Sequence, residues 1–189
     1  FENKIVMIGD TNVGKTSIVA QYSNHSFSSS EQKTVGSYFV SQVVRVGNTD
    51  VLIHIWDTAG EEKFNCLVPM YCRGATAAIL VFNANEENGH ETIQRWYSDF
   101  ESSRINKCNV YLVANKIDLE IKADLQFAEN WAAENNVRFF KISAKDHDAV
   151  QKVFMTVAED LLRERSIDAS ITNQELEREN KCKRSEERR

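Results

Sequence analysis

Two short apolar runs, Ala77–Phe82 and Val110–Ala114, constrain the fold of this chain more than any other feature. Neither run contains a charged or amide side chain, which is typical of central parallel strands buried on both faces. Further strands are predicted at Lys4–Ile8, Val40–Val46, Val51–Trp56 and Val137–Ile142. Helical spacing of apolar residues is found in four segments, namely 18–22, 93–100, 125–132 and 150–161. This alternation, with one hairpin at Gly47–Asp50, predicts an α/β fold whose mostly parallel sheet is covered by helices on both faces.

Composition excludes several classes of protein. The net charge of −5 argues against non-specific binding of nucleic acid by the whole chain. The longest strictly apolar runs have six residues or fewer, so none is expected to span a membrane. The four cysteines form no C-x-x-C pair, which favours the reduced thiols of a cytoplasmic protein.

Charge is concentrated near the C-terminus, where 15 of the 27 residues from Arg163 to Arg189 are charged. Such a segment cannot bury much apolar surface, so it is expected to be a solvated helix extension or a flexible tail. We therefore divide the chain into a globular domain, residues 1–164, and a charged tail, residues 165–189.

The loop after the first predicted strand indicates phosphate binding. Residues 9–16 match the pattern G-x-x-x-x-G-K-[ST] and lie between a strand and a helix, as that motif requires. Lys15 would place its ammonium on the β- and γ-phosphates, and the Thr16 hydroxyl would bind Mg²⁺. Asn12 is one of the few residue types besides glycine that tolerate the positive φ such a loop needs. The backbone N–H groups expected to surround the phosphate oxygens are those of Thr11, Asn12, Val13, Gly14, Lys15, Thr16 and Ser17.

A second loop, Asp57-Thr58-Ala59-Gly60, ends the predicted strand Val51–Trp56. The Asp57 carboxylate could hold Mg²⁺ through water, and the Gly60 N–H could reach a γ-phosphate. A turn or cap role for this aspartate is the alternative, since D-x-x-G alone is a common pattern.

The loop after Val110–Ala114 contains Asn115, Lys116 and Asp118, which together indicate recognition of guanine. A carboxylate at Asp118 could accept two parallel hydrogen bonds from N–H donors on the edge of guanine, whereas adenine would present an acceptor there. Discrimination should be large, because the wrong base leaves a buried polar group unpaired. The Lys116 stem could lie over the base, and Asn115 could connect this loop to the phosphate loop.

The loop after the last predicted strand, Ser143-Ala144-Lys145, supplies a third set of candidates. The Ala144 N–H could read the carbonyl oxygen of guanine. Each of these short motifs alone is also compatible with a loop of solvated charges, but their order, each after its own strand, favours a guanine-nucleotide site.

These four motifs resemble those of the small GTPases of the Ras superfamily, over about residues 3–164. The resemblance narrows to the Rab branch through the stretches Val35–Phe39, Leu52–Trp56, Lys63-Phe64, Tyr71–Ala75 and Val81–Asn83. It implies a three-layer P-loop NTPase G domain with a six-stranded sheet, one antiparallel hairpin strand and five helices. It also implies GTP and GDP as ligands, with Mg²⁺, and a role in vesicle trafficking.

Further site residues follow from the resemblance alone. Thr34 corresponds to the switch threonine that joins Mg²⁺ and senses the γ-phosphate, and Phe27 to the aromatic residue that covers the guanine edge. A core phenylalanine anchoring the first helix is the alternative for Phe27. Glu61 stands where the family usually has a water-positioning glutamine. Together with Lys15 and Thr34 it is a catalytic candidate, and its charge predicts slow intrinsic hydrolysis.

The resemblance also predicts partners and location. Effectors, an exchange factor and a GTPase-activating protein are expected to bind residues 34–45 and 60–75 of a monomer. Cys182 is followed by Lys183–Arg189, which is not a prenylation motif, so we expect either a truncated C-terminus or another mode of attachment to endomembranes. Two rival functions are a guanine-nucleotide scaffold that does not hydrolyse GTP, which Glu61 favours, and a nucleotide kinase. The kinase would need an acceptor site and an arginine-rich lid, and we find neither in the sequence.

Overall fold

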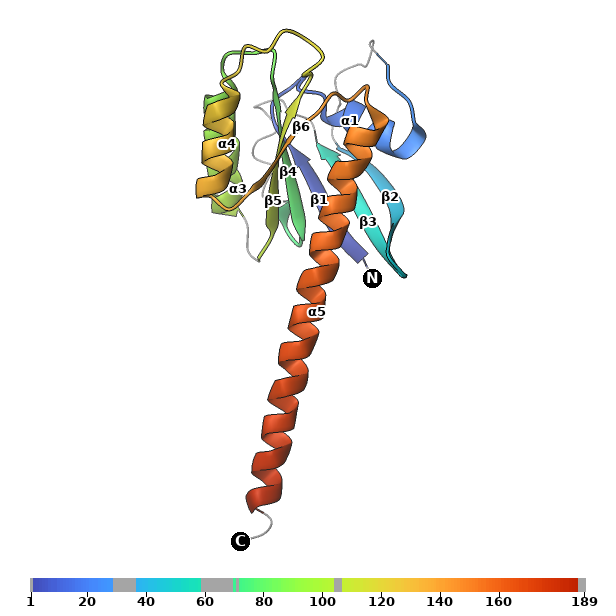
Figure 1. Ribbon diagram of the computed structural model, residues 1–189, viewed down its shortest axis with the longest axis vertical. Coiled ribbons are helices and arrows are strands. Elements are labelled where there is room, and N and C mark those ends of the chain that lie inside the picture. The colour runs from blue at the N-terminus through green and yellow to red at the C-terminus, as the bar shows by residue number, and fades with distance from the viewer. Residues whose placement is uncertain (1, 29–36, 59–69, 71, 104–106, 187–189) are drawn as a thin grey trace.

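The computed structural model describes residues 2–28, 37–58, 70, 72–103 and 107–186. Six strands form one sheet in the order β2-β3-β1-β4-β5-β6 (Figure 1). All neighbouring pairs are parallel except β2 and β3, which form an antiparallel hairpin. The strands are β1 (Glu2–Ile8), β2 (Ser37–Val46), β3 (Thr49–Thr58), β4 (Ala77–Asn83), β5 (Asn109–Asn115) and β6 (Arg138–Lys141). The predicted α/β fold with one antiparallel hairpin strand is therefore confirmed.

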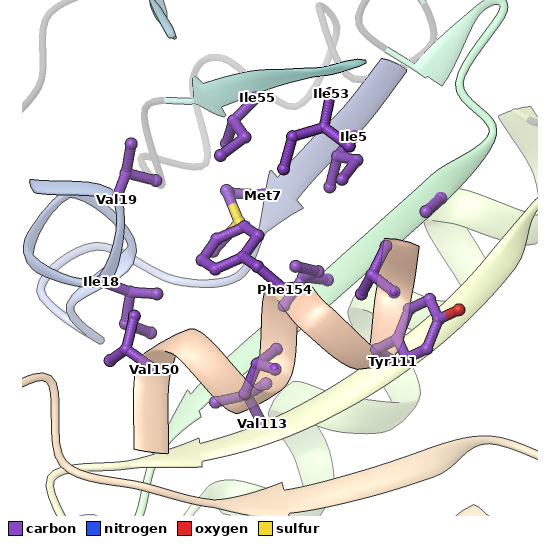
Figure 2. Close-up of a cluster of buried hydrophobic side chains, with 14 of the residues drawn as sticks. Ile5, Met7, Ile18, Val19, Ile53, Ile55, Tyr111, Val113, Val150 and Phe154 are labelled. Atoms are coloured by element: carbon purple, nitrogen blue, oxygen red, sulfur yellow. The ribbon is translucent and has the colours of Figure 1, made fainter. Parts of the chain in front are cut away.

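Each central strand supplies side chains to two separate cores. In β1, Ile5 and Met7 point to one face while Val6 and Ile8 point to the other, as the two-residue period of a strand requires. Helices α1 (Lys15–Asn24) and α5 (His147–Glu186) cover the first face, and α3 (Gly89–Ser103) and α4 (Leu125–Glu134) cover the second. Figure 2 shows the first core, where Phe154 of α5 lies in one cluster with Met7. The result is three layers with the sheet in the middle (Figure 1).

The hairpin is tighter and longer than the sequence predicted. The prediction left Gly47–Asp50 as the connection, but Val46 already pairs with Thr49, so only Gly47 and Asn48 lie between the strands. Gly47 has φ +57, which suits a two-residue turn whose twist matches that of the strands. The longer pairing carries β3 as far as Thr58, which takes Asp57 into the sheet itself.

The described residues contain four helices, whereas the resemblance predicted five. Helix α5 is 40 residues long and extends past the edge of the sheet (Figure 1). Its first part packs on the sheet through residues such as Leu161, whereas Ile167 is 51% exposed. The charged segment after residue 164 is thus helical up to Glu186, and its predicted flexibility remains a prediction. Within the described ranges, no helix is both long enough and apolar enough to cross a membrane.

Candidate functional site

The predicted site residues lie on loops that follow β1, β3, β5 and β6. Because β1, β3, β4, β5 and β6 are parallel, these loops emerge at the same edge of the sheet. That edge, beyond the carboxyl ends of parallel strands, is where open α/β sheets bind ligands. The fold therefore brings together residues that are up to about 130 positions apart in the sequence.

The phosphate loop between β1 and α1 has an unusual backbone. Gly9, Asn12 and Gly14 have φ values of +140, +65 and +97. A side chain is excluded at Gly9, since a Cβ there would lie 2.1 Å from the Val81 carbonyl oxygen. The predicted role of Asn12 as a residue that tolerates a positive φ agrees with this backbone. The loop ends at the N-terminus of α1, where backbone N–H groups and the helix dipole favour an anion.

Lys15 is poised inside this loop. Its side chain is buried, and its Nζ donates to the carbonyl oxygens of Gly9 and Asp10, both at 2.8 Å. Burial lowers the pKa of Lys15 to about 8, against the opposing effect of the Asp57 and Asp10 carboxylates. A buried cation whose hydrogen bonds go to neutral carbonyl oxygens is well suited to receive a phosphate oxygen.

The side chains of Thr16 and Asp57 place a hydroxyl oxygen next to a carboxylate oxygen. The Thr16 hydroxyl donates to Asp57 Oδ2 at 2.5 Å, and Asp57 is fully buried at the end of β3. Mg²⁺ prefers hydroxyl and carboxylate oxygens and usually binds proteins through one or two such groups, completing its shell with water and substrate phosphates. These two oxygen ligands therefore fit a magnesium ion next to the phosphate loop.

Asn115 joins two of the predicted loops. Its side-chain Nδ2 donates to the Val13 carbonyl oxygen at 2.8 Å, and its Oδ1 accepts from the Ala144 N–H at 2.9 Å. Lys116 adds a second connection, since its Nζ donates to the Asn12 carbonyl oxygen at 2.6 Å. The connection predicted for Asn115 is present. The Ala144 N–H is already engaged, so a contact to guanine would share or replace that hydrogen bond.

Asp118 keeps an ionised carboxylate at the edge of the site. Its oxygens accept hydrogen bonds from Lys145 Nζ at 2.6 Å and from Ser143 Oγ at 2.7 Å. These two bonds, that from Lys145 first, hold the pKa of Asp118 below its usual value. A carboxylate offers about four lone pairs to donors, so about two remain for the N–H groups of a base.

Phe27 lies near Lys145, the lysine that donates to this carboxylate, rather than in the core. It is 41% exposed, which excludes the alternative of a core phenylalanine, and its ring lies 5.6 Å from Lys145 Nζ. Ser17 lies in the first turn of α1. Three predicted site residues, Thr34, Gly60 and Glu61, lie outside the described residues.

Sequence reasoning missed a contact of the phosphate loop with α3. Trp96 belongs to the segment 93–100 with apolar residues at helical spacing and is 2% exposed, but its indole N–H donates to Asp10 Oδ1 at 2.7 Å. Thr92 and Arg95 donate to the same carboxylate. The available signal was the tryptophan itself, because a buried indole N–H needs an acceptor.

Comparison with known proteins shows the family of this chain. A model of the Ras family matches residues 4–163. The Ras-related protein Rab-5A of Dictyostelium discoideum is 33% identical over an alignment of 192 positions, which covers 96% of each chain. The Ras-related protein Rab-13 of Rattus norvegicus is 34% identical over 161 residues, covering 84% of this chain and 79% of its own. The Ras-related protein RABF2a of Arabidopsis thaliana is 35% identical over 162 residues, covering 85% of this chain and 81% of its own.

Proposed function

This chain belongs to the Ras family as a Rab-type small GTPase of membrane trafficking, and we propose that its loops after β1, β3, β5 and β6 hold the guanine nucleotide. Membership of the family brings guanine-nucleotide binding, GTP hydrolysis, and regulators and effectors as partners. The rival function of a scaffold that does not turn over is not favoured by these relatives.

At the phosphate end, Lys15 would exchange its two carbonyl acceptors for phosphate oxygens, with N–H groups of residues 11–17 around them. The observation that carries this assignment is the buried Lys15 ammonium, enclosed by a loop with three positive-φ residues. Thr16 and Asp57, joined by Thr34, would hold Mg²⁺, which when bound neutralises charge on the β- and γ-phosphates.

At the base end, Asp118 would accept the two guanine N–H donors, with the stems of Lys116 and Lys145 and the ring of Phe27 lining the base. Asn115, with Ser143 and Ala144 on the facing loop, would keep the two ends at a fixed separation. The hydrogen bonds of Asn115 to both Val13 and Ala144 support this role.

In this proposal, Glu61 determines the intrinsic rate of GTP hydrolysis. An ionised glutamate can accept a hydrogen bond from the attacking water, but it cannot donate to phosphoryl oxygens and its charge opposes theirs. The intrinsic hydrolysis of GTP is therefore slow, and the protein stays in its GTP-bound state longer than a relative with glutamine.

Single-turnover hydrolysis of Mg²⁺-GTP tests this role. Glu61→Gln should be faster than wild type by on the order of a hundredfold, the lower end of the effect of one hydrogen-bond donor at a transition state. Glu159→Gln, at an exposed position on α5, makes the same chemical change away from the site and should match wild type. A glutamine variant no faster than wild type would show that Glu61 does not limit the rate.

Partner proteins would bind the hairpin edge of the sheet, within residues 34–45 and 60–75. Large apolar side chains are exposed there, which supports a protein interface: Tyr38 is 52%, Phe39 47% and Val43 62% exposed on β2. Phe39 also stacks edge-on against Trp56 of the neighbouring strand, with ring centroids 5.2 Å apart.

Residues 1–164 would form the nucleotide-binding domain and residues 165–189 a tail that reaches towards endomembranes, with the protein acting as a peripheral monomer. The ion pair of Glu164 with Lys107 lies at this boundary, just after the last core residue of α5, Leu161. We do not assign nucleic acid as a partner, because the net charge is −5.

A further inference from the structure

The side chain of Asp10 connects the phosphate loop to helix α3. Its carboxylate accepts three side-chain hydrogen bonds, from Thr92 Oγ1 at 3.0 Å, from Trp96 Nε1 at 2.7 Å and from the guanidinium of Arg95. The three donors lie at positions i, i+3 and i+4 of α3 and therefore occupy one face of that helix. Asp10 itself occupies a variable position of the G-x-x-x-x-G-K-[ST] pattern, so the motif does not require this contact.

A loop with this backbone needs external support. A left-handed conformation at a residue other than glycine, such as that of Asn12, persists only where the surroundings hold it in place. The second half of the loop is held from the β5 side, since Asn115 and Lys116 donate to its carbonyl oxygens. The first half is held by the α3 donors, through Asp10.

The same residue also contacts the phosphate-binding lysine. Lys15 Nζ donates to the backbone carbonyl of Asp10, so the Asp10 peptide lies directly beside the ammonium that would receive the phosphate. Resting on the proposed function, we propose that Asp10 is a positioning residue of the phosphate loop. Thr92, Arg95 and Trp96 clamp it, and α3 thereby sets how firmly the loop retains a nucleotide phosphate.

An effect of Asp10 through its charge and an effect through positioning of the loop would change the rate of nucleotide dissociation in opposite directions. If Asp10 acted only through its charge, its removal would relieve repulsion of the phosphates, and the nucleotide would leave more slowly. If Asp10 positions the loop, the loss of its acceptors frees the loop, and the nucleotide leaves faster. Asp10→Asn separates the two effects, because it removes the charge and replaces one acceptor by a donor while keeping the shape.

The test is the dissociation rate of a fluorescent GDP analogue from the full chain with Mg²⁺. Asp10→Asn should release it about tenfold faster, the effect of losing one charge-assisted hydrogen bond. Thr92→Val, which changes no charge, should release it about threefold faster. The matched control is Arg138→Gln, which breaks the ion pair of Arg138 with Asp160, away from the loop, and should stay within about twofold of wild type.

An NMR measurement distinguishes the loss of the α3 contacts to Asp10 from a general loss of stability. The indole N–H resonance of Trp96, assigned with Trp96→Phe, should shift in Asp10→Asn, while that of Trp131 stays in place. If Asp10→Asn does not fold, Thr92→Val decides alone. Dissociation from either variant at the wild-type rate or slower overturns the inference and leaves the proposed function intact. A wild-type protein that retains no GDP overturns both.

Discussion

Truncation of Asn115 to alanine tests how the two ends of the site are joined. Asn115 is 1% exposed, and its amide satisfies two main-chain groups, the Val13 carbonyl and the Ala144 N–H. Alanine leaves both groups without these partners in the interior. Each buried group left unsatisfied costs about 1–3 kcal/mol, so the loss of two partners should lower the free energy of unfolding by about 2–6 kcal/mol. At about 2–4 °C per kcal/mol for a chain of this size, the melting temperature should fall by roughly 4–24 °C.

Nucleotide affinity should fall as well, because the phosphate loop and the base loop lose their common anchor. We expect binding of a fluorescent GDP analogue to Asn115→Ala to be at least about tenfold weaker than to wild type, measured by equilibrium titration. Chemical denaturation of the same samples gives the loss of stability.

Asn83→Ala is the matched control. Asn83 ends β4 directly opposite Asn115, is 6% exposed, and makes two hydrogen bonds of its own, to Glu86 and from the Asn85 N–H. It should lose stability of the same order while keeping its affinity for GDP. The reasoning is refuted if the two variants bind GDP equally well at equal stability.

Two further predictions concern the phosphate loop. The pKa of Lys15 is lowered from 10.5 to about 8, so the unfolded chain binds more protons between these values and the free energy of unfolding of the nucleotide-free protein should rise with pH there. Phosphate binding needs the protonated amine, so affinity for GDP should fall between about pH 8 and 9, by up to about tenfold per pH unit, and a flat profile would contradict this. Gly14→Ala should weaken GDP binding at least about tenfold, because a Cβ there would lie 2.3 Å from Asn115 Nδ2 at φ +97. Gly47→Ala, also at positive φ but with open space around it, should cost about 1–2 kcal/mol of stability and leave affinity unchanged, and equal affinities of the two alanine variants would argue against steric exclusion at Gly14.

Much of the fold could be predicted because the strong patterns lie in its centre. The runs at Ala77–Phe82 and Val110–Ala114 are β4 and β5, which have neighbours on both sides and are buried on both faces. The ends of β2 and β3 were predicted less accurately, because Ser37, Thr49 and Thr58 join the sheet through backbone pairing that side-chain patterns do not reveal. The length of helix α5 was left open for a similar reason: its charged second half carries no core pattern, so the sequence allowed either a solvated helix extension or a flexible tail, and the structure has the helix.

Within the candidate site, the spacing of motifs after strands predicted which loops would meet, because parallel strands deliver their ends to one edge. It could not predict contacts formed by variable residues. The three donors to Asp10 come from a helix that begins 79 positions later in the chain, and only the packing of α3 on the sheet brings them within reach. The left-handed backbone of Lys116, at φ +67, likewise has no signal in its residue type.

The central claim is that Asp118 and the phosphate loop hold one guanine nucleotide between them. Its most direct test is equilibrium competition of GDP and ADP for wild-type protein loaded with a fluorescent GDP analogue in Mg²⁺. ADP should compete at least about 10⁴-fold less well than GDP, the discrimination expected of a site built to pair with donors that the wrong ligand lacks. Displacement by ADP and GDP at similar concentrations would contradict the account.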